Sequence, residues 1–167
     1  MRFKSLPSIL RPQKGFGLLE TVVAIFIITV GLIGGLSLAI SSTTAARNVR
    51  ERFIAYSLAQ EGLELVRNYR DSVWLTEQDG FAPGQTMENN GEYALDYTGL
   101  IEERGAAGDY DLHYENGLYR HDAGALTKYS RSITLQTQGN SKVVISQVSW
   151  ANHELSLELH LYNWRDF

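Results

Sequence analysis

Two hydrophobic patterns follow each other along the first half of the chain. Residues 22–40 are nineteen consecutive uncharged, largely apolar residues. As a helix they would extend about 28 Å, which matches the hydrocarbon thickness of a bilayer. In residues 49–66, apolar positions recur instead at spacings typical of an amphipathic helix. Because no proline occurs in residues 15–82, we predict one helix from residue 16 to about residue 70.

The amphipathic half of this helix needs a second element to cover its apolar face. That face lacks the sustained heptad of a coiled coil, which is the alternative. Ala59 and Gly62 add small residues that favour close packing against something flat. We therefore expect a β-sheet to cover it.

The C-terminal half alternates apolar and polar residues, as strands do. The clearest case is residues 155–162, where four leucines alternate with Ser156, Glu158, His160 and Tyr162. In an earlier strand, Ile133 and Leu135 are expected to point inward. The predicted strands are residues 92–97, 110–114, 118–120, 129–137, 142–150 and 155–162.

Turn residues separate these strands. Residues 115–117 are expected to close a short hairpin, and residues 138–141 and 151–153 to connect an antiparallel meander. Residues 71–91 and 99–108 are predicted to be loops, the first anchored by Trp74 and Phe81.

The order of elements predicts an α+β fold, with one long N-terminal helix packed on a C-terminal antiparallel sheet. The expected segments are a leader (1–15), the transmembrane half of the helix (16–40), its amphipathic half (41–70), a connecting loop (71–91) and the sheet (92–167).

Charge is segregated along the chain. The leader carries a net charge of +4 and the whole chain −4, so the remainder carries −8. Such an acidic body disfavours nucleic-acid binding, which uses a basic face. The chain has no cysteine, which excludes disulfides and thiol chemistry. The basic residues of the leader are Arg2, Lys4, Arg11 and Lys14.

A basic leader before an apolar run can target a protein in two ways. The run is longer than the apolar core of a secretory signal peptide, although residues 43–46 resemble a poor cleavage site. An uncleaved signal anchor is the simpler interpretation. The charges around the run favour an N-terminus in the cytoplasm.

Glu20 is an acid at the start of this helix. A carboxylate within a bilayer is costly, and the cost falls near the interface. In the first turns of a helix, the dipole favours an anion. Glu20 is therefore either an interfacial acid or a group that needs a cationic partner.

Gly15, Phe16 and Glu20, followed by the apolar run, resemble the class III signal of type IV pilins and pseudopilins. The resemblance implies cleavage between Gly15 and Phe16 by a prepilin peptidase and N-methylation of Phe16. It also implies a salt bridge during assembly, in which Glu20 pairs with the Phe16 ammonium of a neighbouring subunit. Such a pair supplies the partner that a buried carboxylate requires.

The run departs from many major pilins because it contains no proline. Gly31, Gly34 and Gly35 are its weak points as a helix, and Gly31 and Gly35 have a GxxxG spacing that permits close helix packing. Later segments resemble minor pilins of the type IV pilus modification protein group. These segments are residues 59–71, 129–134, 148–150 and 162–165.

No catalytic or cofactor motif stands out. The four histidines, at positions 113, 121, 153 and 160, lack the spacing of metal ligands. An acidic cluster leaves calcium binding as an alternative, although its spacing is not that of an EF-hand. Its members are Asp109, Asp111, Glu115 and Asp122. We therefore expect no enzyme, no cofactor and no metal.

These observations predict a minor pilin or pseudopilin, a structural subunit of a type IV pilus or type II secretion-like filament. Its expected partners are the prepilin peptidase, other pilin or pseudopilin subunits, the inner-membrane assembly platform and membrane lipid. It would be a single-pass membrane protein that later enters an extracytoplasmic filament. The alternative is a signal-anchored binding module, such as an adhesin or receptor subunit, that never polymerises. The sequence does not choose among pilus, secretion and DNA-uptake filaments.

Overall fold

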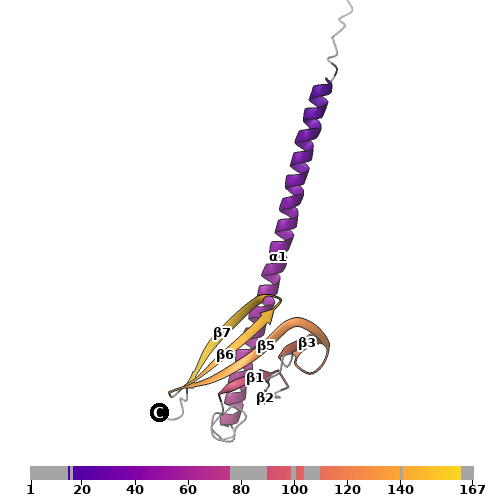
Figure 1. Cartoon of the computed structure of the whole chain (residues 1–167). Helices are drawn as coiled ribbons and strands as arrows, with labels where there is room; N and C mark the ends of the chain where they lie inside the picture. Colours follow the sequence, from indigo (N-terminus) through magenta and orange to yellow (C-terminus); the bar gives the residue numbers. More distant parts are fainter. Residues whose placement is uncertain are drawn as a thin grey trace, which may run out of the picture. The chain divides into compact units, whose positions relative to one another are not determined.

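The computed structural model describes residues 15, 17–75, 90–98, 101–103 (backbone only), 110–139 and 141–162. Its contacts divide the chain into two units, residues 1–47 and 48–167, and each is described by itself. The elements (Figure 1) are α1 (Leu18–Leu75), β1 (Gly91–Leu95), β2 (Ile101–Glu103), β3 (Asp111–Glu115), β4 (Leu118–Arg120), β5 (Ala125–Gln138), β6 (Ser141–Trp150) and β7 (His153–Tyr162).

The predicted α+β arrangement is confirmed, since the second half of α1 packs against an antiparallel sheet. The helix continues to Leu75, five residues past the predicted end. Arg70 and Trp74 are buried and extend the stripe of contact residues, and the Arg70 guanidinium lies 4.6 Å from the centroid of the Trp74 ring. Trp74 therefore belongs to the helix and not to the predicted loop. Phe81 lies outside the described residues.

β5 is the central strand of the sheet. Along one edge it pairs with β6 over its C-terminal ten residues, and β6 pairs in turn with β7. Along the other edge it pairs with β3 near its start and with β1 further on. All of these pairings are antiparallel, so the predicted meander of three long strands is confirmed.

One strand was not predicted and two strands begin earlier than predicted, because each has a pairing partner in the sheet. Residues 101–103, predicted to be a loop, form β2 and pair with β1. β5 begins at Ala125 because its first residues pair with β3, and β7 begins at His153, which pairs with Trp150. The short hairpin turns at Asn116 and Gly117, both with positive φ (51° and 89°), as a two-residue hairpin loop requires.

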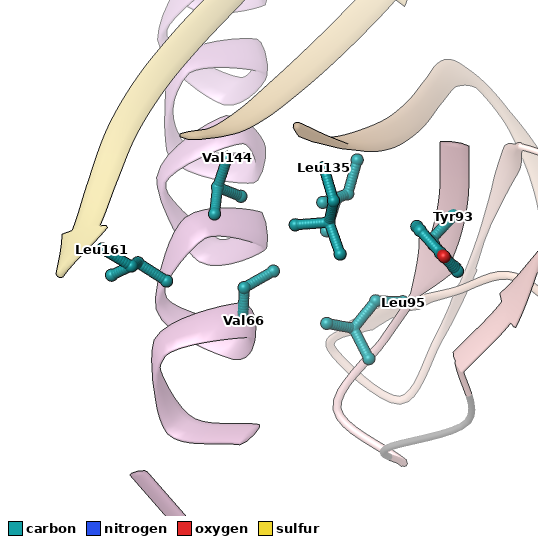
Figure 2. Close-up of a cluster of buried hydrophobic side chains, with 7 residues drawn as sticks. Val66, Tyr93, Leu95, Leu135, Val144 and Leu161 are labelled. Carbon is teal, nitrogen blue, oxygen red and sulfur yellow. The ribbon is translucent and has the colours of Figure 1, made fainter. Parts of the chain in front are cut away.

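The core between α1 and the sheet consists of two clusters of buried side chains. Figure 2 shows the first, in which Val66 of α1 lies among side chains of the sheet. The second lies further towards the N-terminus of the helix. The first contains Val66, Tyr93, Leu95, Ile133, Leu135, Val144 and Leu161, and the second Ala55, Leu58, Ala59, Leu112, Tyr129, Val148 and Trp150.

Arg131 connects the two clusters on β5. Tyr129 belongs to one cluster and Ile133 to the other, and alternate residues of a strand share a face. The Arg131 side chain, 0% exposed, donates hydrogen bonds from Nη1 to the Leu58 carbonyl (3.1 Å) and from Nη2 to the Leu95 carbonyl (2.8 Å). It therefore ties α1 to β5 and β1 from inside the core.

Glu61 supplies the anion for this buried cation, with its Oε1 3.5 Å from Nη1 of Arg131. Burial lowers the pKa of Arg131, and the carboxylate of Glu61 opposes that shift. Because the pKa of a free guanidinium is so high, Arg131 stays charged. The core of the body thus contains a cation held by one carboxylate and two backbone carbonyls.

At Gly62 the helix packs tightly against the sheet. A Cβ built there would lie 2.5 Å from Ser146 Oγ and 3.2 Å from Arg131 Cδ. Ala55 and Ala59 continue this contact line and are fully buried. The expectation that Ala59 and Gly62 mark close packing against a flat surface is confirmed.

We expect Gly62→Ala to lower the free energy of unfolding by about 1–3 kcal/mol, because overpacking outweighs the better helix propensity of alanine. Ser146 Oγ is buried and has no hydrogen-bond partner in the described part of the chain, so Ser146→Ala alone should be nearly neutral. The double variant should recover part of the stability that Gly62→Ala loses, because the clash between the new Cβ and Ser146 Oγ disappears. Denaturant unfolding of the four proteins in detergent measures this coupling; strictly additive effects would contradict the contact.

Asp96 organises the turn that follows β1. Its buried carboxylate accepts hydrogen bonds from the backbone N (2.8 Å) and the hydroxyl of Thr98 and from the backbone N of His121 (3.3 Å). Burial raises the pKa of Asp96, but these bonds to its charged form outweigh burial, and the net pKa is lowered. Asp96 therefore joins the turn to the segment that precedes β5.

The lowered pKa predicts a loss of stability in acid. A carboxylate with a folded-state pKa below its unfolded value of about 3.9 stabilises the fold fully above that value, and the contribution is lost as the pH falls through the folded-state pKa. We expect the stability difference between wild type and Asp96→Asn to be largest near pH 6 and to shrink below about pH 4. Unfolding curves of both proteins from pH 6 to pH 3 measure it; a constant difference would contradict the assignment.

Candidate assembly segment

At the start of α1, Thr21 bonds to the residue four positions before it. The Gly17 carbonyl accepts hydrogen bonds from the backbone N (3.1 Å) and the hydroxyl (3.3 Å) of Thr21. Glu20 lies in the first turn of α1, where the unpaired N–H groups favour an anion. The structure thus places Glu20 at the helix start, as the sequence predicted.

The following turns of α1 are apolar and exposed within the chain. The large hydrophobic side chains from Leu18 to Ile40 are between 47% and 83% exposed. The helix contains an 18-residue window with a mean hydropathy of 2.6, none of it buried, and is long and apolar enough to cross a membrane. A helix that is apolar all round needs lipid or other helices around it.

Threonine hydroxyls in and beside this segment donate hydrogen bonds to backbone carbonyls of the same helix. Thr29, Thr43 and Thr44 donate to the carbonyls four residues before them, at 2.7, 2.8 and 3.0 Å. This bonding removes the cost of placing a hydroxyl in an apolar environment. Glu20 is then the one charged side chain in residues 15–46.

Gly31 and Gly35 lie four residues apart and hence on one side of the helix. A Cβ at either position, or at Gly34, would meet nothing within 4 Å. That side is therefore open to a neighbouring helix. The packing role of Gly31 and Gly35 stays a prediction, because it requires another subunit.

The predicted processing site is described only in part. Gly15 is exposed, and a Cβ there would meet nothing within 4 Å. Phe16 and the leader before Gly15 lie outside the described residues. Cleavage between Gly15 and Phe16, and methylation of Phe16, stay predictions.

Two acids of the cluster considered for calcium binding pair with an arginine. Glu115 and Asp122 both pair with Arg120, at 3.4 and 3.1 Å, and Asp111 accepts from the Ser130 hydroxyl at 2.7 Å. Asp109 lies outside the described residues. No group of three or more His, Asp or Glu side chains within the described ranges could hold a metal ion.

Two of the four histidines lie on the surface. His153 and His160 are exposed, and His160 Nε2 lies 2.8 Å from Glu158 Oε1. The sequence interpretation missed the buried Arg131 and Asp96. Strand alternation could have found Arg131, since a strand with Ile133 and Leu135 inward also directs residue 131 inward.

Comparison with known proteins bears on the N-terminal segment. Residues 10–36 match the family model described as the prokaryotic N-terminal methylation motif. No curated protein matches the chain, and no solved structure does. The matched residues include the predicted cleavage site, Glu20 and residues 22–36 of the apolar run.

Proposed function

We propose that this chain is a minor pilin or pseudopilin, made as a single-pass, membrane-anchored precursor with a type IV pilin-type leader. In this proposal it is a structural subunit of a type IV pilus or type II secretion-like filament and not an enzyme. Prepilin peptidase removes residues 1–15. The new N-terminus at Phe16 is then methylated.

The observation that carries the proposal is an apolar helical segment, none of it buried, with one acid in its first turn. Lipid covers the apolar surface of the helix before assembly, and neighbouring helices cover it afterwards. A carboxylate can enter such an interior only with a cation beside it. In the proposed filament, the N-terminal ammonium of a neighbouring subunit, four residues before its own Glu20, is that cation.

The body beyond the membrane segment supports a structural role. Its core is organised around packing of α1 on the sheet and around Arg131. Some of its charged side chains form internal ion pairs, such as those around Arg120. The proposed partners are other pilin or pseudopilin subunits and the inner-membrane assembly platform. Nucleic acid is disfavoured by the acidic composition.

Mass spectrometry of the N-terminus of the native protein tests the proposal. We expect the mature chain to begin at Phe16 and to carry one added methyl group on its amine. A Gly15→Ala variant, made as control, should retain the leader if the peptidase requires glycine. An intact Met1, or a start near Ala46, would instead support a signal-anchored binding module that does not polymerise.

A further inference from the structure

We propose that the first turns of α1 beyond the apolar segment bind anionic headgroups of the membrane that anchors the chain. The contact is made by Arg50 and Arg52, with Arg47 just before them, and each arginine pairs with the phosphate of a lipid. This inference rests on the membrane anchor of the proposed function and not on assembly, because it concerns the chain before it enters a filament.

The uncharged stretch of α1 is long enough to reach through the headgroup layers. Residues 21–46 contain no charged side chain, and as a helix they rise about 39 Å. A bilayer with its headgroups measures about 40–45 Å. Arg47 therefore comes at the outer edge of the headgroups, and Arg50 and Arg52 follow within about 8 Å. Helical side chains lean towards the N-terminus of their helix, which here is towards the lipid, and long arginine side chains bring their charged ends to such an interface.

Glu51, the one acid among these arginines, has its charge compensated inside the fold. Its carboxylate forms an ion pair with Lys128 of β5, and its backbone carbonyl accepts a hydrogen bond from the Tyr129 hydroxyl (3.4 Å). Arg50 and Arg52 are exposed, and none of the ion pairs among the described residues includes either of them. These turns of the helix therefore present uncompensated positive charge.

The directions of the arginines favour a partner that surrounds the helix. At about 100° per residue, Arg47 and Arg50 lie about 60° apart around the axis, and Arg52 lies about 140–160° from each. Ala55 and Ala59, which are buried against the sheet, fall between the directions of Arg47 and Arg52. A docked protein covers one side of a helix, whereas a headgroup layer surrounds a helix that crosses it. Anionic lipids attract each arginine that lies near their surface.

Native mass spectrometry of the full chain released from nanodiscs tests the inference. Each disc holds one chain in an equimolar mixture of phosphatidylglycerol and phosphatidylcholine, and the ratio of the two lipids that the chain retains is measured. Arg50→Gln is compared with Arg67→Gln, since Arg67 lies on the same helix about 25 Å further from the membrane segment. The basic leader is the same in all of these proteins, so a difference in the ratio comes from the substituted position.

We expect the wild type to retain phosphatidylglycerol in preference to phosphatidylcholine. An arginine near an anionic surface contributes about fivefold to this preference. Arg50→Gln should therefore lower the ratio about fivefold, and adding Arg52→Gln should lower it further. Arg67→Gln should leave the ratio unchanged.

The ion pair on β5 gives a second test of the same contact. Lys128→Gln leaves the Glu51 carboxylate without its cation, beside the arginines that bind the lipid. It should lower the preference for phosphatidylglycerol, although Lys128 belongs to the sheet. Adding Glu51→Gln to the same chain should restore the preference, because the uncompensated acid is then gone.

An unchanged ratio in Arg50→Gln, or an equal loss in Arg67→Gln, would overturn the inference. A preference that appears only in discs holding two chains would do the same, because the partner of the arginines would then be another subunit. If the chain inserts into the discs but shows no lipid preference, the headgroup contact alone fails. If it does not insert, the membrane anchor fails, and the proposed function fails with it.

Discussion

Replacing Glu20 by alanine should remove the chain from assembled filaments while leaving the body folded. Glu20 is the only charged side chain of the apolar segment and lies in the first turn of α1. In the proposed filament its loss leaves the Phe16 ammonium of a neighbour without a partner in an apolar interior. Removing one partner of a buried pair costs about 3–5 kcal/mol, which corresponds to more than a hundredfold in the assembled fraction.

The measurement is the ratio of the chain in sheared filaments to the chain left in the membrane. Glu154→Ala is the matched control, since Glu154 is an exposed acid of β7. It should be incorporated normally. Tryptophan fluorescence should be unchanged in both variants, because Trp74 and Trp150 are buried in the body. Normal incorporation of Glu20→Ala would refute the assembly mechanism.

Arg131→Ala should destabilise the body by about 3–5 kcal/mol, because it truncates a large, fully buried side chain and removes its hydrogen bonds. The substitution leaves Glu61 without its cation and removes the donors to the Leu58 and Leu95 carbonyls. It also opens a cavity between the two core clusters, which adds to the loss. Thermal and denaturant unfolding of the full chain in detergent, followed by tryptophan fluorescence, measures the change.

Arg67→Ala is the control for Arg131→Ala. Arg67 pairs with Glu64 at 2.6 Å on the exposed side of the helix, and an exposed pair of this kind contributes at most about 1 kcal/mol. Glu61→Gln should give an intermediate loss, because glutamine keeps an acceptor near Arg131 and loses the charge. Equal effects of Arg131→Ala and Arg67→Ala would show that burial of the guanidinium is unimportant.

The sequence was most informative where structure depends on neighbours in the chain. The apolar run, the place of Glu20 in the first turn and the continuous helix all follow from local composition and from the absence of proline. The strict alternation of residues 155–162 likewise located β7, and the turn at residues 115–117 located the hairpin. Each of these features is decided within a few residues, so a periodicity in the sequence reveals it.

Long-range pairing produced the elements that the sequence interpretation missed. Residues 101–103 have no strong strand pattern and form β2 because β1 offers them an edge. Residues 125–128 join β5 because β3 lies alongside. The helix extends to Leu75 because the side chains of Arg70 and Trp74 are buried in the folded body. Such pairings depend on partners distant in the chain, and β propensity alone does not encode them.

Sequence alone therefore determined that this chain has an apolar N-terminal helix with one acid at its start, followed by an amphipathic half and a sheet. Tertiary structure alone decided how the body is held together. Only packing brings Gly62 against Ser146 and places Arg131 between Leu58, Leu95 and Glu61. The reason is physical: a periodicity shows that a residue faces inward, but the partners of a buried charge come from elements far apart in the chain.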